Sequence, residues 1–289
     1  MTQPITAGLD GSPESLAAVD WAAEEALRRG VPLRLVHAWM LPPQTARTAQ
    51  APEARRLWGQ ELLDWTEKQV RDRYPKVEVA TELLARTPVE ALVAENAATG
   101  LLVLGAHGRG AVGGFLLGSV GLRVLTLSHH PVVMVHKDAA VQTEPDKGDI
   151  LVGIQDPPGS AVPIEFAFAA AKAHGTGVRA VRACAPPPVF PHKPRAEGLT
   201  EETSQGEAAE MERLVEAVAL WREKYPGVPV TEEVERGHAA EVLLAAASRA
   251  SLVVVGRPAH RPVVGPRIGH VAHALLHHAD CPVAVVPYE

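Results

Sequence analysis

Short runs of apolar residues alternate along the chain with longer stretches in which apolar residues recur at helical spacing. Between the runs at 5–9 and 33–39, for example, Leu16, Val19 and Ala23 recur every three or four positions. The apolar runs of the first half predict five strands, at residues 5–9, 33–39, 77–83, 101–104 and 131–135. Strands that alternate with helices predict a parallel sheet covered by helices on both faces.

Polar residues between these runs mark where helices begin and end. Ser12 is a favoured N-cap and Pro13 suits the first helical position, so a helix should start there and end at Gly30. The sequence from Thr87 to Glu90 has the form of a capping box, with a proline at the first helical position. It predicts a second helix start, with the helix stopping at Gly100.

Three tryptophans fall on or beside apolar helical stripes. A long amphipathic helix is predicted through Leu62 and Val70, ending before Tyr74. We expect Trp21, Trp58 and Trp65 to be core or interface residues rather than ligand contacts.

The second half of the chain repeats the first. Residues 150–154 repeat residues 5–9 at an offset of 145, whereas Tyr225-Pro226 matches Tyr74-Pro75 at an offset of 151. The order therefore indicates a duplicated domain rather than a solenoid of small repeats. We predict domains at 1–138 and 149–289, joined by a polar linker at 139–148. The change of offset indicates a net insertion of six residues, which we assign to the proline-rich segment 186–194.

Composition narrows the class of protein. The chain has 289 residues, 46% of them hydrophobic, without a run of eighteen apolar residues, so we expect a soluble globular protein. The N-terminus lacks a basic head and an apolar signal core, which predicts a cytoplasmic protein. Cys184 and Cys281 are the only cysteines and are expected to be free thiols. A net charge of −6 and 4% aromatic residues argue against nucleic-acid binding, and membrane binding is not expected.

A glycine-rich stretch at residues 105–120 follows the fourth predicted strand and precedes a helix. Glycines let backbone N–H groups approach an anion closely, and the first N–H groups of a helix lack intrahelical partners. Gly118-Ser119 at the helix start adds a bare backbone and a hydroxyl donor. The stretch therefore favours a phosphate-binding loop, and a mobile surface loop is the alternative.

The spacing of this stretch resembles a family signature. Gly105, two residues, Gly108, nine residues and Gly118-Ser119 resemble the G-2x-G-9x-G-[S/T] motif of the universal stress protein family, and Asp10 stands where nucleotide-binding members carry an aspartate. The resemblance implies two tandem Rossmann-like domains of the adenine nucleotide α-hydrolase type, each an α/β fold with a five-stranded parallel sheet. It also implies bound ATP, with or without Mg²⁺, at the carboxyl ends of the strands.

The resemblance places the ATP site on particular residues of the first domain. They are Gly8, Leu9, Asp10, Ala38, Gly105, Gly108, Arg109, Gly118, Ser119 and Val120. Asp10 has the alternative role of a turn former, and Arg109 could be a solvated loop residue instead of a phosphate ligand. The resemblance further implies that the two fifth strands, 131–135 and 282–286, pair with each other as an internal pseudo-dimer, which would hide both edges. A homodimer of chains remains open.

The second copy departs from the motif. Ala259 is at the position equivalent to Gly108, His270 at that of Ser119 and Gln155 at that of Asp10. The prolines at 258, 262 and 266 each remove a backbone N–H donor from the loop. We therefore predict that the first domain binds ATP and that the second binds it weakly or not at all.

Other classes of site fit less well. A P-loop places a lysine after its last glycine, where this chain has Ser119, and a dinucleotide fold places its glycines after the first strand. We find no general base placed to activate water, so catalytic residues are not predicted. His273 and His277 have a metal-binding spacing, but a polar helix face is the favoured interpretation, and His37 is expected in the core. The resulting hypotheses are an ATP-binding regulatory protein read by an unknown protein partner, a slow ATP hydrolase or phosphotransferase, or a partner-recruiting scaffold.

Overall fold

The computed structural model describes residues 3–40, 51–106, 118–137, 148–156, 159–184, 198–259 and 268–289. The first half contains β1 (Ile5–Gly8), α1 (Pro13–Arg29), β2 (Leu33–Ala38), α2 (Pro52–Arg73), β3 (Val79–Leu84), α3 (Pro88–Ala98), β4 (Leu101–Ala106), α4 (Ser119–Leu127) and β5 (Val132–His136). The second half contains β6 (Ile150–Gly153), α5 (Ala161–His174), β7 (Val178–Cys184), α6 (Gly198–Lys224), β8 (Val230–Arg236), α7 (Ala239–Ala247), β9 (Leu252–Pro258), α8 (His270–His278) and β10 (Val283–Tyr288).

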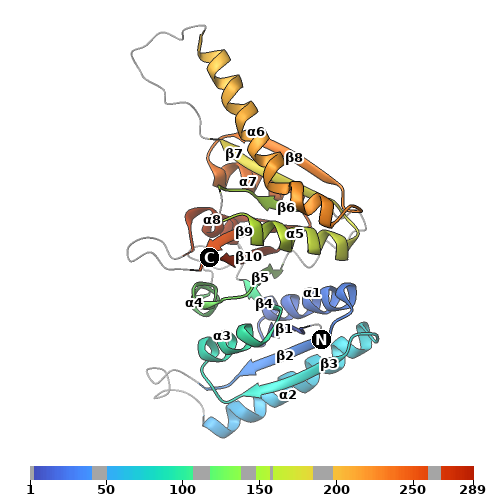
Figure 1. Cartoon of the computed structure of the whole chain (residues 1–289). Helices are drawn as coiled ribbons and strands as arrows, with labels where there is room; N and C mark the ends of the chain where they lie inside the picture. Colours follow the sequence, from blue (N-terminus) through green and yellow to red (C-terminus); the bar gives the residue numbers. More distant parts are fainter. Residues whose placement is uncertain are drawn as a thin grey trace.

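The two halves share one ten-stranded sheet in the order β3-β2-β1-β4-β5-β10-β9-β6-β7-β8 (Figure 1). Strands within each half pair in parallel, and β5 and β10 pair antiparallel at the centre, with Val133 opposite Ala284. The prediction that the fifth strands pair is therefore confirmed. The parallel sheet with helices between its strands is confirmed as well.

Two apolar layers cover the faces of the sheet. Alternate residues of each strand point to opposite faces, so Ala284 of β10 joins one layer and its neighbour Val285 joins the other. The helices α1, α2, α5 and α6 pack on one face, and α3, α4, α7 and α8 pack on the other. The fold is a three-layer α/β/α arrangement.

The predicted helix ends are largely confirmed. The Ser12 hydroxyl accepts a hydrogen bond from the Ser15 amide at 3.1 Å, and Gly30 ends α1 in the left-handed conformation. Thr87 and Glu90 form the reciprocal capping box at the start of α3, which ends at Ala98, two residues before the predicted Gly100.

The insertion in the second half is in a different place from the prediction. The connections 39–51 and 185–197 have equal length, whereas α6 has 27 residues and α2 has 22. Five of the six additional residues therefore lengthen the helix, whose start projects beyond β7 and β8 in Figure 1, and the sixth lengthens β7 relative to β2. The proline-rich segment 186–194 lies outside the described residues.

Burial excludes one of the two predicted roles, a place in the core, for two of the three tryptophans. Trp21 packs against the core, but Trp58 and Trp65 are 48% and 51% exposed, so they are not core residues. Both cysteines are free, with Cys281 buried and Cys184 half-buried. Within the described ranges, none of the helices combines the length and apolarity that a membrane span needs.

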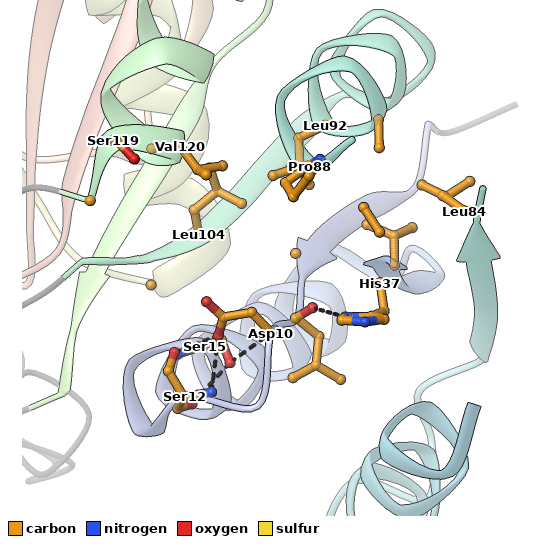
Figure 2. Close-up of a pocket in the computed structure, with 18 residues that line it drawn as sticks. Asp10, Ser12, Ser15, His37, Leu84, Pro88, Leu92, Leu104, Ser119 and Val120 are labelled. Carbon is orange, nitrogen blue, oxygen red and sulfur yellow. Dashed lines mark hydrogen bonds between the residues drawn. The ribbon is translucent and has the colours of Figure 1, made fainter. Parts of the chain in front are cut away.

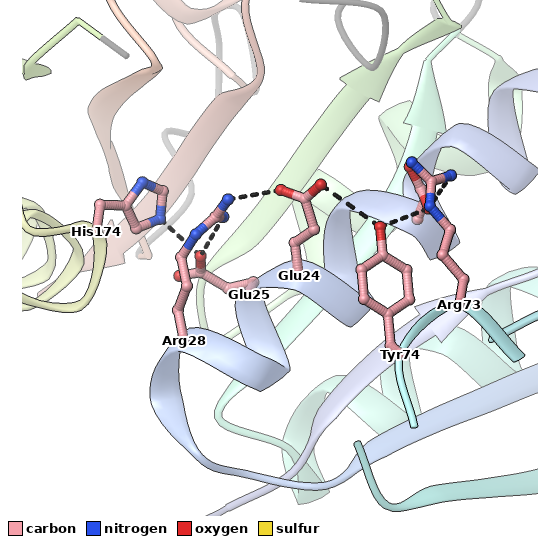
Figure 3. Close-up of polar contacts among 7 residues, drawn as sticks. Glu24, Glu25, Arg28, Arg73, Tyr74 and His174 are labelled. Carbon is pink, nitrogen blue, oxygen red and sulfur yellow. Dashed lines mark hydrogen bonds and ion pairs between the residues drawn. The ribbon is translucent and has the colours of Figure 1, made fainter. Parts of the chain in front are cut away.

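A buried charge cluster joins the two halves through α1 and α5 (Figure 3). Glu25 is fully buried; His174 Nε2 lies 2.6 Å from one carboxylate oxygen, and Arg29 Nη2 lies 2.5 Å from the other. Burial alone would raise the pKa of Glu25, but the hydrogen bond from His174 and the charge of Arg29 lower it to about 2. Glu25 is therefore ionised at neutral pH and links the two halves.

Candidate functional site

A cavity of about 300 Å³ opens at the carboxyl ends of β1, β2 and β4. This is the edge at which parallel sheets usually bind ligands. Its lining comes from those strands, β3, the loop after β1, the first turn of α1, α3 and the start of α4. The residues are Gly8, Leu9, Asp10, Ser12, Ser15, Val36, His37, Ala38, Leu84, Pro88, Ala91, Leu92, Leu104, Gly105, Gly118, Ser119, Val120 and Gly121.

The structure brings together eight of the ten residues that the sequence predicts for the site. They are Gly8, Leu9, Asp10, Ala38, Gly105, Gly118, Ser119 and Val120. Gly108 and Arg109 lie outside the described residues.

The start of α4 presents backbone amides without an intrahelical partner to the cavity. Gly118 is the N-cap and has no side chain to cap the helix, and the first intrahelical bond runs from the Leu122 amide to the Gly118 carbonyl at 3.0 Å. The amides of Ser119, Val120 and Gly121 therefore have no partner within the helix, and all three residues line the cavity. Together with the positive end of the helix dipole, they suit an anion.

Asp10 shapes the loop between β1 and α1. Its Oδ1 accepts hydrogen bonds from the Ser12 amide at 2.9 Å and the Ser12 hydroxyl at 2.5 Å. The Asp10 amide in turn donates to the Ser15 hydroxyl at 3.3 Å. Asp10 is thus a turn former that also lines the cavity, and it is the only carboxylate among the described lining residues.

His37 fixes the other side of this loop. The ring is buried, as the sequence predicts, and its Nδ1 lies 2.7 Å from the Leu9 carbonyl. Since a carbonyl oxygen only accepts, Nδ1 carries the proton and donates. The other edge of the ring faces α2, where a Cβ on Gly59 would stand 2.5 Å from His37 Cδ2. His37 therefore connects α2 to the residue that precedes Asp10.

Gly105 has a structural reason to be glycine. A Cβ at this position would lie 2.5 to 2.7 Å from backbone atoms of Glu14 and Ser15, because the first turn of α1 crosses β4 there. A larger residue would push α1 away from the sheet. Gly105 lines the cavity, but a substitution there would not isolate a role in binding.

The cavity has a polar end and an apolar end. Ser119 and Leu84 lie at opposite ends of the group of side chains in Figure 2. Leu84, Pro88 and Leu92 form an apolar wall that the sequence analysis missed. The rule that ligands bind at strand ends could have pointed to Leu84 and Val36, the residues at or near the ends of β3 and β2.

The equivalent position in the second half is crossed by side chains. Gln155, which matches Asp10, donates from Nε2 to the Tyr288 hydroxyl at 2.9 Å. The Tyr288 ring packs on Gly256, where an added Cβ would stand 3.0 Å from ring atom Cε1. Gly256 matches Gly105, so a ligand placed as in the first half would meet this ring.

Charged side chains in the second half replace the contact between His37 and Gly59. Arg182 stands at the position of His37 and is 8% exposed. It donates to Asp156 at 2.6 Å and also to Glu210, which stands at the position of Gly59. These ion pairs tie α6 to the loop after β6.

The late histidines form a helix face. The rings of His273 and His277 are 4.4 Å apart, and the described residues contain no group of three or more histidine, cysteine or acidic side chains arranged to hold a metal. Desolvation and the neighbouring His273, His278 and His136 lower the pKa of His277. His270, the counterpart of Ser119, begins α8.

Comparison with known proteins agrees with the repeat. A sequence profile described as the universal stress protein family matches residues 1–136 and 148–287. The chain is 35% identical over 290 residues to "Universal stress protein Rv2005c" of Mycobacterium tuberculosis, covering 97% of this chain and 96% of that protein. It is 32% identical over 294 residues to "Universal stress protein Rv2623" of the same species, covering 97% and 95%. The crystal structure of a universal stress protein from Archaeoglobus fulgidus aligns over 98% of both chains with a TM-score of 0.67 and 15% identity, a likeness of fold.

Proposed function

The chain belongs to the universal stress protein family as a tandem two-domain member, and we propose that it is a regulatory protein that binds ATP in the cavity of its first half. The observation that carries the proposal is the division of that cavity. The α4 amides that lack a partner within the helix lie at one end. Leu84 lies at the other end, with Pro88 and Leu92 between them on an apolar wall (Figure 2). A nucleotide needs this combination, because its phosphates seek N–H donors and its base seeks an apolar slot.

The residues divide between the parts of the nucleotide. The amides of residues 119–121 and the Ser119 hydroxyl hold phosphate oxygens, and the loop of Leu9 and Asp10 borders the ribose. The base lies against Leu84, Pro88 and Leu92, beside the backbone of Ala38. If a divalent cation accompanies the phosphates, Asp10 is the carboxylate that would hold it.

Regulation follows from differential binding. A ligand stabilises the conformation that it binds, and it shifts an equilibrium only as far as its affinities for the two states differ. The cavity is walled by α1, α3 and α4 and, through His37, by α2. Bound ATP would therefore order several elements at once, and a partner protein could read that ordered state.

Hydrolysis is not favoured by the described lining residues. Asp10 and His37 are the only lining side chains there that could act as a base. Asp10 already accepts two hydrogen bonds from Ser12, and His37 uses Nδ1 on the Leu9 carbonyl and turns its other edge to Gly59. Neither is placed to activate water on a terminal phosphate.

The proposal includes one nucleotide per chain. The hydrogen bond from Gln155 to Tyr288 and the contact of Tyr288 with Gly256 fill the position in the second half that corresponds to the cavity. Displacing the Tyr288 ring would cost hydrogen bonding and packing before any phosphate contact formed.

Calorimetric titration with ATP tests the proposal, together with identification of any nucleotide released from the purified protein. We expect one site per chain. Ser119→Ala should weaken binding by at least tenfold, since a hydrogen bond to a charged group contributes about 1.5 to 3 kcal/mol. Gly118→Ala should weaken binding as well, because its methyl group would crowd the approach to the α4 amides.

The matched control is His270→Ala, which changes the equivalent position of the second half. It should leave affinity and stoichiometry unchanged. Equal ATP binding by the wild type and the Ser119→Ala and Gly118→Ala variants would reject this site, and two sites per chain would reject the asymmetry. A turnover assay with and without Mg²⁺ separates a binding protein from an ATP hydrolase.

A further inference from the structure

An apolar strip, exposed at its two tryptophans and half-buried at its leucine, runs along α2 on the outside of the first half. Its members are Trp58, Leu62 and Trp65, spaced i, i+4, i+7, so they lie on one helix face. Trp65 borders a groove of about 490 Å³ between α1 and α2, whose α1 side includes Leu16 and Ala17. Large exposed apolar surfaces of this kind mark interaction sites.

The second half does not have this strip. Leu63 and Val70 of α2 match the buried Leu214 and Trp221 of α6, which fixes the correspondence of the two helices. At the strip positions α6 carries Ala209, Arg213 and Glu216 in place of Trp58, Leu62 and Trp65. Trp58 and Leu62 have contacts within the first half, since the Trp58 ring lies edge-on to His37 at 5.4 Å and Leu62 packs against the core. Trp65 is 51% exposed, and the second half carries Glu216 at its position, so the fold does not require an apolar side chain there.

Acidic residues flank the strip on α2. Glu61, Asp64 and Asp72 form the adjacent row of the helix, in which Lys68 is the only cation. All four side chains are exposed. Two copies of this face would bring the acidic rows together, so the charge opposes self-association through the strip.

Local ion pairing neutralises the α1 side of the groove. Asp20 accepts hydrogen bonds from the Tyr74 hydroxyl at 2.8 Å and pairs with Arg73 at 2.8 Å. The charge that remains for a partner is therefore the acidic row of α2. Apolar contact in the centre and positive charge at the edge are the features that this surface would recognise.

We propose that the groove between α1 and α2 of the first half is a docking site for an amphipathic helix of a partner protein, with aliphatic residues at i, i+3, i+4 and i+7 and lysine or arginine at its flanks. Such a helix would lay its apolar face on Trp58, Leu62 and Trp65. Its basic flank would meet Glu61, Asp64 and Asp72. This inference does not depend on nucleotide binding.

Two fluorescently labelled synthetic peptides of identical leucine pattern test the proposal, one with lysine and one with glutamate at all other positions. Anisotropy with the full chain should show saturable binding of the lysine peptide and at least tenfold weaker binding of the glutamate peptide. Trp65→Glu, which installs the residue that α6 carries at this position, should weaken the lysine peptide at least tenfold. Trp65→Phe should retain binding within about threefold.

The control is Leu220→Ser, which removes the most exposed large apolar side chain among those described on α6 and should change binding by less than twofold. Circular dichroism establishes that each variant is folded. Equal binding of the lysine peptide by wild type and Trp65→Glu, or a failure of that peptide to bind the wild type, would overturn the proposal. It would also be overturned by a wild-type dimer in sedimentation that Trp65→Glu dissociates, since the strip would then serve self-association.

Discussion

The buried carboxylate of Glu25 offers the sharpest test of how the two halves are held together. Glu25→Gln keeps the shape of the side chain and removes its charge, leaving Arg29 and His174 without a full counter-charge in a buried position. Lowering the pKa from 4.5 to about 2 corresponds to about 3 kcal/mol at 1.36 kcal/mol per unit. Breaking one partner of a buried pair costs about 3 to 5 kcal/mol in other proteins. We therefore expect the variant to lose about 3 kcal/mol or more of its free energy of unfolding at pH 7.

The stabilisation by ionised Glu25 should depend on pH in a defined direction. The folded state holds the Glu25 proton only near pH 2, whereas the unfolded state takes it up near pH 4.5. The stabilisation from the ionised group is complete above about pH 4.5 and is lost as the pH falls from 4.5 toward 2. The part of the difference between wild type and Glu25→Gln that comes from ionised Glu25 should therefore shrink as the pH falls below 4.5.

Urea unfolding followed by circular dichroism at several pH values measures this difference, with each transition fitted separately if the halves unfold apart. The control is Glu24→Gln. Glu24 is one residue away, is partly exposed and pairs with Arg28 at 2.5 Å, a contact of the kind that contributes up to about 1 kcal/mol. Equal losses for the two variants, or a Glu25→Gln difference that does not change below pH 4.5, would refute the reasoning.

Three further predictions concern packing, capping and thiol chemistry. Gly59→Ala places a methyl group 2.5 Å from His37 Cδ2 and 2.9 Å from Leu83 Cδ1, so the free energy of unfolding should fall by about 1 to 3 kcal/mol. Gly227→Ala, where the added methyl group meets nothing within 4 Å, should have a smaller effect, and equal melting temperatures would contradict the clash. Thr87→Ala should lower stability by about 1 kcal/mol in urea unfolding because it removes the capping box of α3, and Thr87→Ser should retain most of it. If Thr87→Ser lowered the free energy of unfolding as much as Thr87→Ala, the loss would come from the missing methyl group and not from the capping box. Burial raises the pKa of Cys281 to about 12, so an aromatic disulfide reagent at pH 8 should modify Cys184 in the native protein and Cys281 only after unfolding. Rapid modification of both thiols in the native state would show that Cys281 is accessible and would contradict this prediction.

Most of the fold could be predicted from the sequence because the signals are local. Apolar runs, the cap at Ser12 and the box at Thr87 each depend on a few neighbouring residues, and the repeat predicts the second half from the first. The pairing of β5 with β10 followed from the need to cover two apolar edges.

The errors concern relations between elements. Helical spacing shows that Trp58 and Trp65 share a face with apolar neighbours, but it does not show whether another element covers that face. The sequence prediction placed the insertion in a loop because that segment is rich in proline. A helix, however, can take extra residues without leaving backbone groups unpaired. The apolar wall of the cavity was missed because Leu84, Pro88 and Leu92 come from two elements that meet only in three dimensions.

Fusion of the two halves allows an arrangement that a symmetric pair of identical subunits could not have. Arg29 and His174 occupy corresponding positions of α1 and α5, whereas Glu25 corresponds to Ala170. The carboxylate of Glu25 therefore contacts a basic side chain from each half. Two copies of the first half alone would confront each other with two such acids, and two copies of the second half would have none. The buried charge cluster is therefore asymmetric, with its acid in the first half and one base in each half.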